Sequence, residues 1–210
     1  MIKNILIFII FASPPVFGGV DKSEVNIFIK FMHDKYSFDQ EELRNLFDNV
    51  RVEPRIKKYI KKAPERTLTW NGCAVNDRKC TNYRNLFVNN KNIQNGIDFW
   101  KNNLRALTKA EKEFGVPAEI IVAIIGIESK YGSRTGTFKT FDTLVSLSLG
   151  ENKGRRAKFY KTELINFLLM CRENKFDPSI IKGSYAGALG KPQFISSSYR
   201  HYAVDFDKDG

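Results

Sequence analysis

Glu128 is the residue whose position in the chain most clearly suggests chemistry. It follows Ile120–Ile127, a run without a polar side chain. If this run is helical, Glu128 lies one turn after Ile124, on the same face. A carboxylate on a buried apolar stripe loses hydration, so its pKa rises and it suits general-acid work near neutral pH. The alternative is a helix-end carboxylate that pairs with Lys130 or Arg134.

A second candidate is the loop 183–194, GSYAGALGKPQF, which is rich in glycine and alanine. Small residues let the backbone approach another group closely. Gln193 in this loop offers both donor and acceptor groups, as sugar hydroxyls and acetamides require. The alternative is a tight loop that only packs against a helix.

Alternating acidic residues near the end of the printed sequence indicate a metal site. Asp205, Asp207 and Asp209 are followed by Gly210, which matches the opening half of a calcium-binding loop. Oxygen ligands at alternate positions and a turn glycine are the features of that pattern. The alternative is an acidic segment without a bound ion.

Two arginines precede aromatic residues at the start of another apolar segment. Arg155 and Arg156 are followed by Phe159 and Tyr160. Guanidinium groups beside aromatic rings suit an acidic glycopeptide, because arginine binds carboxylates with paired hydrogen bonds. The alternative is the solvated first turn of a helix.

The elements that would position these residues are mostly helices. Apolar residues recur at helical spacing in several segments, and few segments alternate with the period of a strand. In the first segment Val25, Phe28, Ile29 and Met32 share one face. The sequence therefore predicts a mainly α fold with helices over 25–34, 37–50, 95–114, 117–128, 141–149 and 155–172, a basic segment over 55–62, and renewed order over 194–202.

The composition is that of a folded, basic protein. The 210 residues are 42% hydrophobic, which favours a folded core over global disorder. They carry a net charge of +11. A basic surface favours an anionic partner such as nucleic acid, acidic lipid or an acidic cell-wall polymer. Because no nucleic-acid recognition motif occurs, we expect no nucleic-acid partner.

The N-terminus predicts export. Residues 1–18 combine Lys3, a compact apolar run and small residues before Gly19, as in a cleaved signal peptide. The run contains no lipoprotein cysteine, and no later segment is long and apolar enough to span a membrane. We expect a periplasmic or cell-envelope protein without a stable membrane span after cleavage.

The cysteines fit that location. Cys73 and Cys80 lie close together in a polar stretch, where a local disulfide would form after export. Cys171 follows an apolar run and is predicted to be a buried free thiol. The three cysteines and the two histidines are not spaced as a metal site.

Taken together, these motifs resemble the lytic murein transglycosylase B family, whose members cleave peptidoglycan. The resemblance extends from about Val25 to Gly210. It is carried by Tyr83-Arg84 with Phe87, Asn92–Gly96 with Phe99-Trp100, Gly115–Ile121, Ile124–Glu128, Tyr131-Gly132, Arg155–Ala157 with Tyr160, Gly183–Phe194 and Tyr202–Phe206.

The resemblance implies a lysozyme-like helical core with flanking N-terminal helices. After the signal peptide, residues 19–95 would form an N-terminal helical region and a wrapping segment. Residues 96–210 would form the catalytic core. The family continues beyond the position of Gly210 with a part that completes the calcium loop and closes the groove. We expect a monomer.

The resemblance also implies the roles of the candidate residues. Glu128 would be the single acid/base that cleaves the bond between N-acetylmuramic acid and N-acetylglucosamine and forms a 1,6-anhydro ring. Ser184 would position Glu128. The remaining roles are substrate binding by Gln193, Arg155, Arg156, Tyr160 and Tyr131, and calcium binding by Asp205, Asp207 and Asp209. No cofactor is required for the chemistry.

Two positions depart from the family pattern. Tyr131 stands where tryptophan is frequent, and Ser196 replaces a proline. Because the family's C-terminal part does not follow Gly210, a second hypothesis is an inactive remnant that binds peptidoglycan glycan strands without cleaving them.

Overall fold

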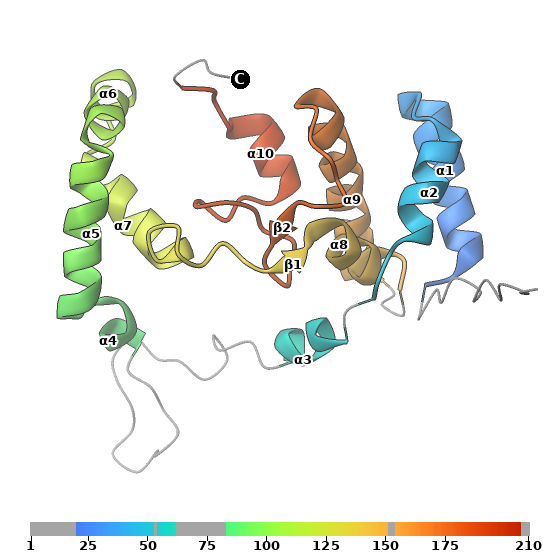
Figure 1. Cartoon of the computed structure of the whole chain (residues 1–210), viewed down its shortest axis with the longest axis horizontal. Coiled ribbons are helices and arrows are strands. Elements are labelled where there is room, and N and C mark those ends of the chain that lie inside the picture. The colour runs from blue at the N-terminus through green and yellow to red at the C-terminus, as the bar shows by residue number, and fades with distance from the viewer. Residues whose placement is uncertain (1–19, 53, 62–82, 151–153, 207–210) are drawn as a thin grey trace, which may run out of the picture.

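A computed structural model describes residues 20–52, 54–61, 83–150 and 154–206 (Figure 1). The described chain is mainly helical, as predicted. Its helices are α1 (Lys22–Tyr36), α2 (Gln40–Asp48), α3 (Arg55–Lys61), α4 (Tyr83–Phe87), α5 (Asn90–Asn102), α6 (Leu104–Phe114), α7 (Ala118–Ser129), α8 (Thr140–Ser148), α9 (Arg155–Glu173) and α10 (Ser196–Tyr202). Two short strands, β1 (Phe138–Lys139) and β2 (Lys182–Gly183), complete it.

The larger hydrophobic core lies between the N-terminal helices and α8–α9. The ring of Phe47 in α2 lies 5.1 Å from that of Phe141 in α8, edge to face, and Phe28 of α1 contacts Phe47 in the same way. Burial of one such side chain contributes about 1.5–3 kcal/mol. This core therefore joins segments that are more than 90 residues apart in the sequence.

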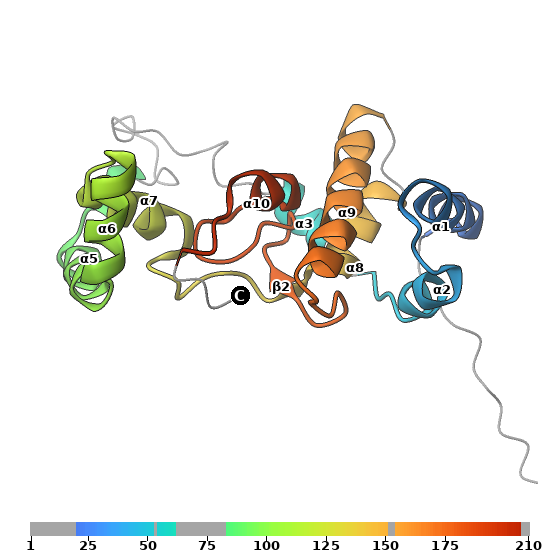
Figure 2. The same ribbon diagram turned by 90° about the horizontal axis from the view of Figure 1, so that it is seen from above.

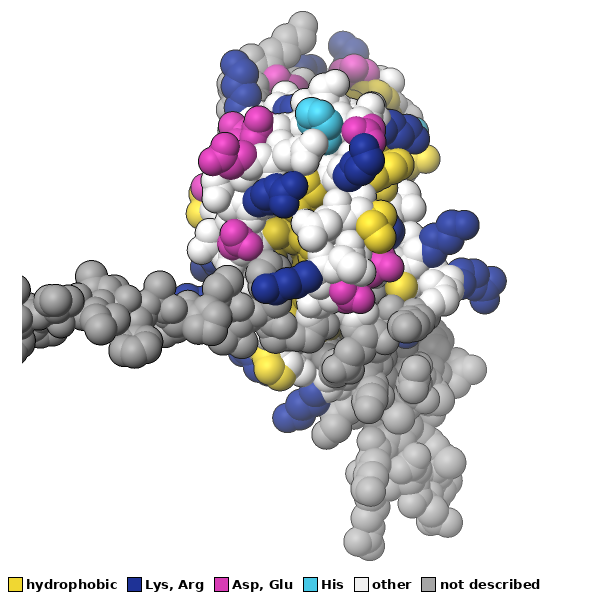
Figure 3. Space-filling model, turned by 90° about the vertical axis from the view of Figure 1, so that its right-hand side faces the viewer, with side chains coloured by type: hydrophobic (Ala, Val, Ile, Leu, Met, Phe, Trp, Pro, Cys, Tyr) yellow, Lys and Arg dark blue, Asp and Glu magenta, His cyan; other side chains and the backbone are white. Residues whose placement is uncertain are grey.

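The first two helices form where the sequence predicts them. Asp21 and Asp39 act as N-caps, and each side chain accepts a hydrogen bond from a backbone N–H in the first turn, at 2.8 Å. The buried face of α1 consists of the four predicted residues, Val25, Phe28, Ile29 and Met32. Figure 3 shows that the outer surface at this end mixes basic and acidic side chains. Lys30 and Asp34 of α1 form an exposed ion pair at 2.8 Å.

Helices α5, α6 and α7 form the opposite end of the molecule (Figure 2). The prediction of one helix over 95–114 is wrong, because Asn103 separates α5 from α6. Its side-chain Nδ2 donates to the carbonyl of Phe99 at 2.7 Å, and asparagine bonds of this kind compete with the helical backbone. Gly115 ends α6 in the left-handed conformation and Pro117 caps α7, as predicted.

The prediction that the α7 stripe is buried is also wrong for the described chain. Ile120, Ile124 and Ile127 are about half exposed. On its covered side, Ala118 and Val122 of α7 are buried against Leu107 of α6 and Phe99 of α5. Helices α5 and α6 cover α7 on one side, and the isoleucines of its other side stay exposed among the described residues.

The small sheet lies between the two ends and connects them. Strands β1 and β2 pair antiparallel, with Phe138 opposite Gly183. The backbone N–H of Leu189 donates to the carbonyl of Phe194 at 2.8 Å, and the reverse bond is also formed. These bonds fold the loop 183–194 back on itself between α7 and α10 (Figure 1).

Two predictions lie wholly outside the described residues, namely the signal peptide over 1–18 and the Cys73–Cys80 disulfide. Cys171 is confirmed as a buried free thiol. Among the described helices, none has both the length and the apolar character needed to cross a membrane.

Candidate active site

Glu128 occupies the last turn of α7, and its side chain is exposed. No hydrogen bond or ion pair joins it to another described residue, so the predicted alternative pairing with Lys130 or Arg134 is not formed there. The sequence interpretation required a buried carboxylate, and the half-exposed isoleucines of α7 explain why burial is absent. The catalytic role of Glu128 stays a prediction.

The turn after Glu128 has a defined geometry. Lys130, Tyr131 and Gly132 all have positive φ angles, of 48°, 60° and 87°. The buried hydroxyl of Ser129 donates to the carbonyl of Ile125 at 3.2 Å and accepts from the N–H of Gly132 at 3.0 Å. Consecutive left-handed residues turn the chain directly after α7, so Glu128 lies in the last turn of the helix, just before this turn.

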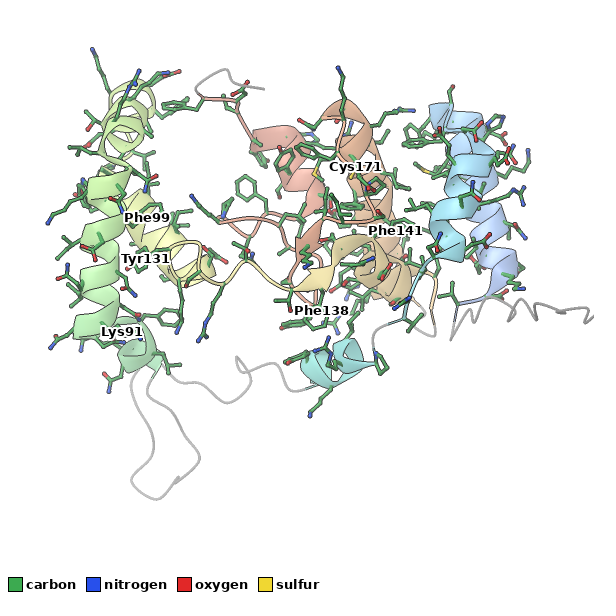
Figure 4. The ribbon with its side chains drawn as sticks, in the orientation of Figure 1. Lys91, Phe99, Tyr131, Phe138, Phe141 and Cys171 are labelled. Atoms are coloured by element: carbon green, nitrogen blue, oxygen red, sulfur yellow. The ribbon has the colours of Figure 1, made fainter. Side chains whose placement is uncertain are left out.

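Tyr131 lies between α5 and α7. Its ring centre is 5.8 Å from that of Phe99, and Figure 4 shows the two rings close together. A Cβ atom at Gly126 would lie 2.7 Å from this ring, and one at Gly96 would lie 2.8 Å from its hydroxyl. The ring also lines a pocket of about 160 Å³ beside Ile127. Tyr131 is therefore a packing residue in this structure, and its predicted contact with substrate stays a prediction.

Ser184 shapes the loop 183–194. Its Oγ accepts hydrogen bonds from the backbone N–H groups of Ala186 and Ala188, at 3.3 and 3.0 Å. The predicted bond from Ser184 to Glu128 is not present among the described hydrogen bonds. The hydroxyl can still donate a proton to an acceptor outside the loop.

Contacts between backbone segments bring this loop against the chain that follows Glu128. Gln193, at φ 51°, donates from Nε2 to the carbonyl of Thr135 at 3.2 Å. A Cβ atom at Gly136 would overlap the carbonyl of Gly183, so this crossing accepts only glycine. Two predicted motifs that are distant in sequence thus lie side by side.

Arg155, Arg156 and Tyr160 lie together in the first two turns of α9. Both arginines are exposed, and Tyr160 is partly buried. Burial raises the pKa of the Tyr160 hydroxyl, while Arg156 lowers it and Tyr185 of the loop raises it. The charge of Arg156 and the hydroxyl of Tyr185 thus act on the Tyr160 pKa in opposite directions.

The predicted calcium loop is described only at its beginning. Asp205 is exposed, and Asp207 and Asp209 lie outside the described residues. No group of three potential metal ligands occurs in the described parts of the chain. The neighbouring Phe206 is fixed by Lys109 of α6, whose Nζ donates to the Phe206 carbonyl at 3.0 Å and lies 4.2 Å from the ring centre.

Sequence reasoning missed two residues at this site. The Lys191 side chain packs over Gly132, and its Nζ lies 5.9 Å from the ring centre of Phe99. The buried carboxylate of Glu163 in α9 accepts a hydrogen bond from the backbone N–H of Ser197 at 2.9 Å. This bond attaches the start of α10 to α9. An acidic residue inside an apolar helix was the signal for Glu163, whereas Lys191 gave none.

Larger hollows lie elsewhere. Two grooves of about 660 and 630 Å³ run beside the C-terminal half of α9. The second is lined in part by Leu189, Gly190 and Pro192 of the loop 183–194, but neither groove contains a residue to which the sequence assigns a catalytic or binding role. The candidate site is therefore defined by the chemistry of its residues and by the contact between the two loops.

Comparison with known proteins places this arrangement in a family. The family model "Transglycosylase SLT domain" matches residues 21–210. The membrane-bound lytic murein transglycosylase B of Escherichia coli K12 is 39% identical over 184 residues, which are 87% of this chain and 50% of that protein. The chain thus spans about half the length of this relative.

Solved structures of lytic transglycosylases support the same family assignment. The lytic transglycosylase Slt35 of E. coli, in complex with calcium, superposes with a TM-score of 0.77 at 37% identity, over 89% of this chain and 55% of that chain. SltB3 of Pseudomonas aeruginosa, in complex with NAG-NAM-pentapeptide, gives a TM-score of 0.72 at 26% identity, over 89% and 46%. The predicted lysozyme-like helical fold is confirmed, and the chain belongs to the transglycosylase SLT domain family.

Proposed function

We propose that this protein is a peptidoglycan lytic transglycosylase in which Glu128 is the single acid/base. The observation that carries the proposal is the family match over residues 21–210, with Glu128 at the exposed end of α7. The sugar-binding loop predicted around Gln193 lies against the segment that follows this helix. A glycan strand along that contact would bring a glycosidic bond to the carboxylate.

The chemistry needs one carboxyl group in two protonation states. Protonated Glu128 donates to the glycosidic oxygen as the bond to C1 of N-acetylmuramic acid breaks. The resulting carboxylate then takes the proton of the C6 hydroxyl, whose oxygen attacks C1 and closes a 1,6-anhydro ring. Water is not consumed, so the second carboxylate that ordinary glycosidases use is not required.

The supporting residues would act on the strand. Ser184 keeps a donor hydrogen that can point to the carboxylate of Glu128, because its lone pairs bond within the loop. Gln193 and Tyr131 would contact sugars, and Arg155, Arg156 and Tyr160 would meet the acidic part of the strand. The substrate is peptidoglycan by analogy with SltB3, which binds NAG-NAM-pentapeptide. The chain would act as a monomer in the cell envelope.

Digestion of purified cell walls tests this function. Mass spectrometry should find anhydro-muramic ends, which are one water molecule lighter than hydrolysed ends. Glu128→Gln should abolish release, whereas Glu119→Gln, the same change at the other exposed end of α7, should not. Reducing muramic acid ends would indicate a hydrolase, and equal release by Glu128→Gln and the wild type would refute the role of Glu128.

One observation favours the second hypothesis of binding without cleavage. Glu128 is exposed and has no hydrogen-bond partner among the described residues, so its carboxylate is solvated there. In that case the wild type and Glu128→Gln would both bind cell walls in a pull-down, and neither would release fragments.

Calcium binding is a separate part of the proposal. Slt35 has been solved with calcium, and Asp205, Asp207 and Asp209 have the spacing of oxygen ligands. Calcium should raise the melting temperature of the wild type more than magnesium does. Asp205→Asn should reduce that increase, and an equal response of both proteins to calcium would contradict the assignment.

A further inference from the structure

The start of α10 receives no cap from its own segment. The first backbone N–H groups of a helix have no partner within the helix and need an outside acceptor. Ile195 occupies the N-cap position of α10, and its apolar side chain offers no acceptor. Ser196 is 1% exposed, and its Oγ has no hydrogen-bond partner within the described parts of the chain. The first turn of α10 therefore depends on another element.

Glu163 of α9 supplies the missing acceptor. Its side chain is 3% exposed, and Oε2 accepts the hydrogen bond from the backbone N–H of Ser197 at 2.9 Å. A buried carboxyl group costs free energy unless its oxygens meet donors. This bond thus accounts for a polar side chain among the buried residues of α9, and it fixes where α10 begins.

The end of the loop 183–194 leads directly into this contact. Three residues separate Gln193 from Ser197. Phe194 pairs with Leu189 through two backbone hydrogen bonds, of 2.8 and 3.1 Å. Gln193 itself has a φ of 51°, in the left-handed region that residues other than glycine rarely adopt. A residue in such a conformation keeps it only while the surrounding chain is held in place.

The loop is held on two sides. On the side of α7, Nε2 of Gln193 donates to the carbonyl of Thr135. On the side of α9, Glu163 holds Ser197. Tyr160 precedes Glu163 by three residues, so both side chains lie on one side of α9. Helix α9 therefore carries, one turn apart, a predicted substrate-binding residue and the residue that fixes the end of the predicted sugar-binding loop.

We propose that Glu163 is a positioning residue, which sets the place of Gln193 in the glycan site by fixing the start of α10. Glu163 is buried and does not touch the substrate. Its effect on sugar binding passes through Gln193, whose amide would contact the sugar. The inference rests on the proposed function, because it requires that Gln193 binds the glycan strand.

A double-mutant cycle in glycan binding tests this role. Glu128→Gln serves as the parent, and calorimetry measures its affinity for a tetramer of N-acetylglucosamine, which carries acetamide groups but no peptide. Gln193→Ala should weaken binding about fivefold, as the loss of one or two hydrogen bonds predicts. Glu163→Met keeps the length of the side chain without an acceptor oxygen, and it should weaken binding about threefold. In the Gln193→Ala background the same substitution should leave the affinity nearly unchanged.

Matched variants separate positioning from folding. Glu163→Gln keeps an acceptor oxygen and should bind as the parent does, whereas a loss as large as in Glu163→Met would exclude the hydrogen bond as the cause. Arg200→Gln removes the hydrogen bonds to Glu173 and Asn166 that join a later part of α10 to α9. It should lower the melting temperature but not the affinity. Glu163→Asp, whose carboxylate is one methylene shorter, replaces Glu163→Met in the cycle if that variant does not fold.

Several results would overturn the inference without touching the proposed function. Equal weakening by Glu163→Met in both backgrounds would do so, because the effect would then not pass through Gln193. Unchanged affinity of Glu163→Met would do so as well, and so would a loss of affinity in Arg200→Gln. In each case release of anhydro-muramic fragments by the wild type leaves the proposed function standing. If the parent does not bind the tetramer and the wild type releases nothing from cell walls, the proposed function fails and the positioning role with it.

Discussion

The side-chain amide of Gln193 donates to the carbonyl of Thr135 at 3.2 Å, across 58 residues of sequence. The same Nε2 donates to the carbonyl of Gly190 at 2.9 Å. One amide therefore fixes its own loop and attaches that loop to the segment after α7. Its Oε1 atom remains as the acceptor through which Gln193 would contact a sugar.

Replacement of this amide should loosen the site. In Gln193→Glu both donors are lost and a carboxylate faces two carbonyl oxygens, so the free energy of unfolding should fall by about 1–3 kcal/mol. Gln193→Met has a similar length and adds no charge, so its loss should be smaller. Urea unfolding of the three proteins measures both effects. Equal stability of Gln193→Glu and the wild type would show that the contact is not formed in solution.

Gly126→Ala should destabilise the protein, although alanine usually stabilises a helix. The added Cβ would lie 2.7 Å from the ring of Tyr131, and overpacking of this kind costs about 1–3 kcal/mol. In a Tyr131→Ala background the same substitution should instead stabilise by about 0.5–1 kcal/mol. Thermal unfolding of the four proteins in this cycle gives the sign in each background. The same sign in both would exclude the clash as the cause.

The helices of the larger core could be predicted because their burial follows local periodicity. Val25, Phe28 and Met32 repeat at helical spacing, and these residues face the core. The break at Asn103 could not be predicted in this way, since the pattern continues through it. It depends on whether one side-chain amide bonds to the backbone of Phe99 or to water.

The sequence indicated candidate residues for the site but not their arrangement. Gln193 stood out because the glycine-rich loop contains few groups that can do chemistry, whereas Ser184 came from the family resemblance. Their position near α7 depends on the crossing of Gly136 and Gly183, which no local pattern encodes. The predicted burial of the helix that carries Glu128 failed because an apolar sequence shows that a face can be covered, not that a neighbour covers it.

Acid should weaken the attachment of α10 to α9. Arg200 forms two hydrogen bonds with Glu173, at 2.8 and 2.6 Å, and these hold the pKa of the Glu173 carboxyl below its usual value of 4.5. The pair therefore stabilises the fold fully above about pH 4.5, and the contribution is lost as the pH falls through the lowered pKa. Because both side chains are partly exposed, the effect should stay below about 1 kcal/mol.

The measurement is the difference in unfolding free energy between the wild type and Glu173→Gln, followed from neutral to acidic pH. This difference should shrink as the pH falls, since the protonated carboxyl resembles the amide of the variant. A difference that is independent of pH would show that the ion pair does not contribute.

Asp142 of α8 should show the opposite dependence. Burial raises the pKa of its carboxyl above the usual 3.8, although Arg51 and Lys139 oppose the shift. A raised pKa favours the folded state at low pH, and this contribution is lost as the pH rises through the raised value. Relative to Asp142→Asn, the wild type should therefore become less stable as the pH rises from about 3 to 6. The reverse slope would mean that the two cations outweigh the burial.

The thiol of Cys171 should resist modification in the folded protein. Its side chain is 3% exposed, and burial raises the pKa of the thiol to about 12, so almost none is ionised near pH 8. In a variant with Cys73→Ser and Cys80→Ser, a disulfide reagent should react no faster than the chain unfolds. In concentrated guanidinium chloride the same thiol should react at once. Complete reaction within minutes under native conditions would show that the α9 core opens far more readily than its packing indicates.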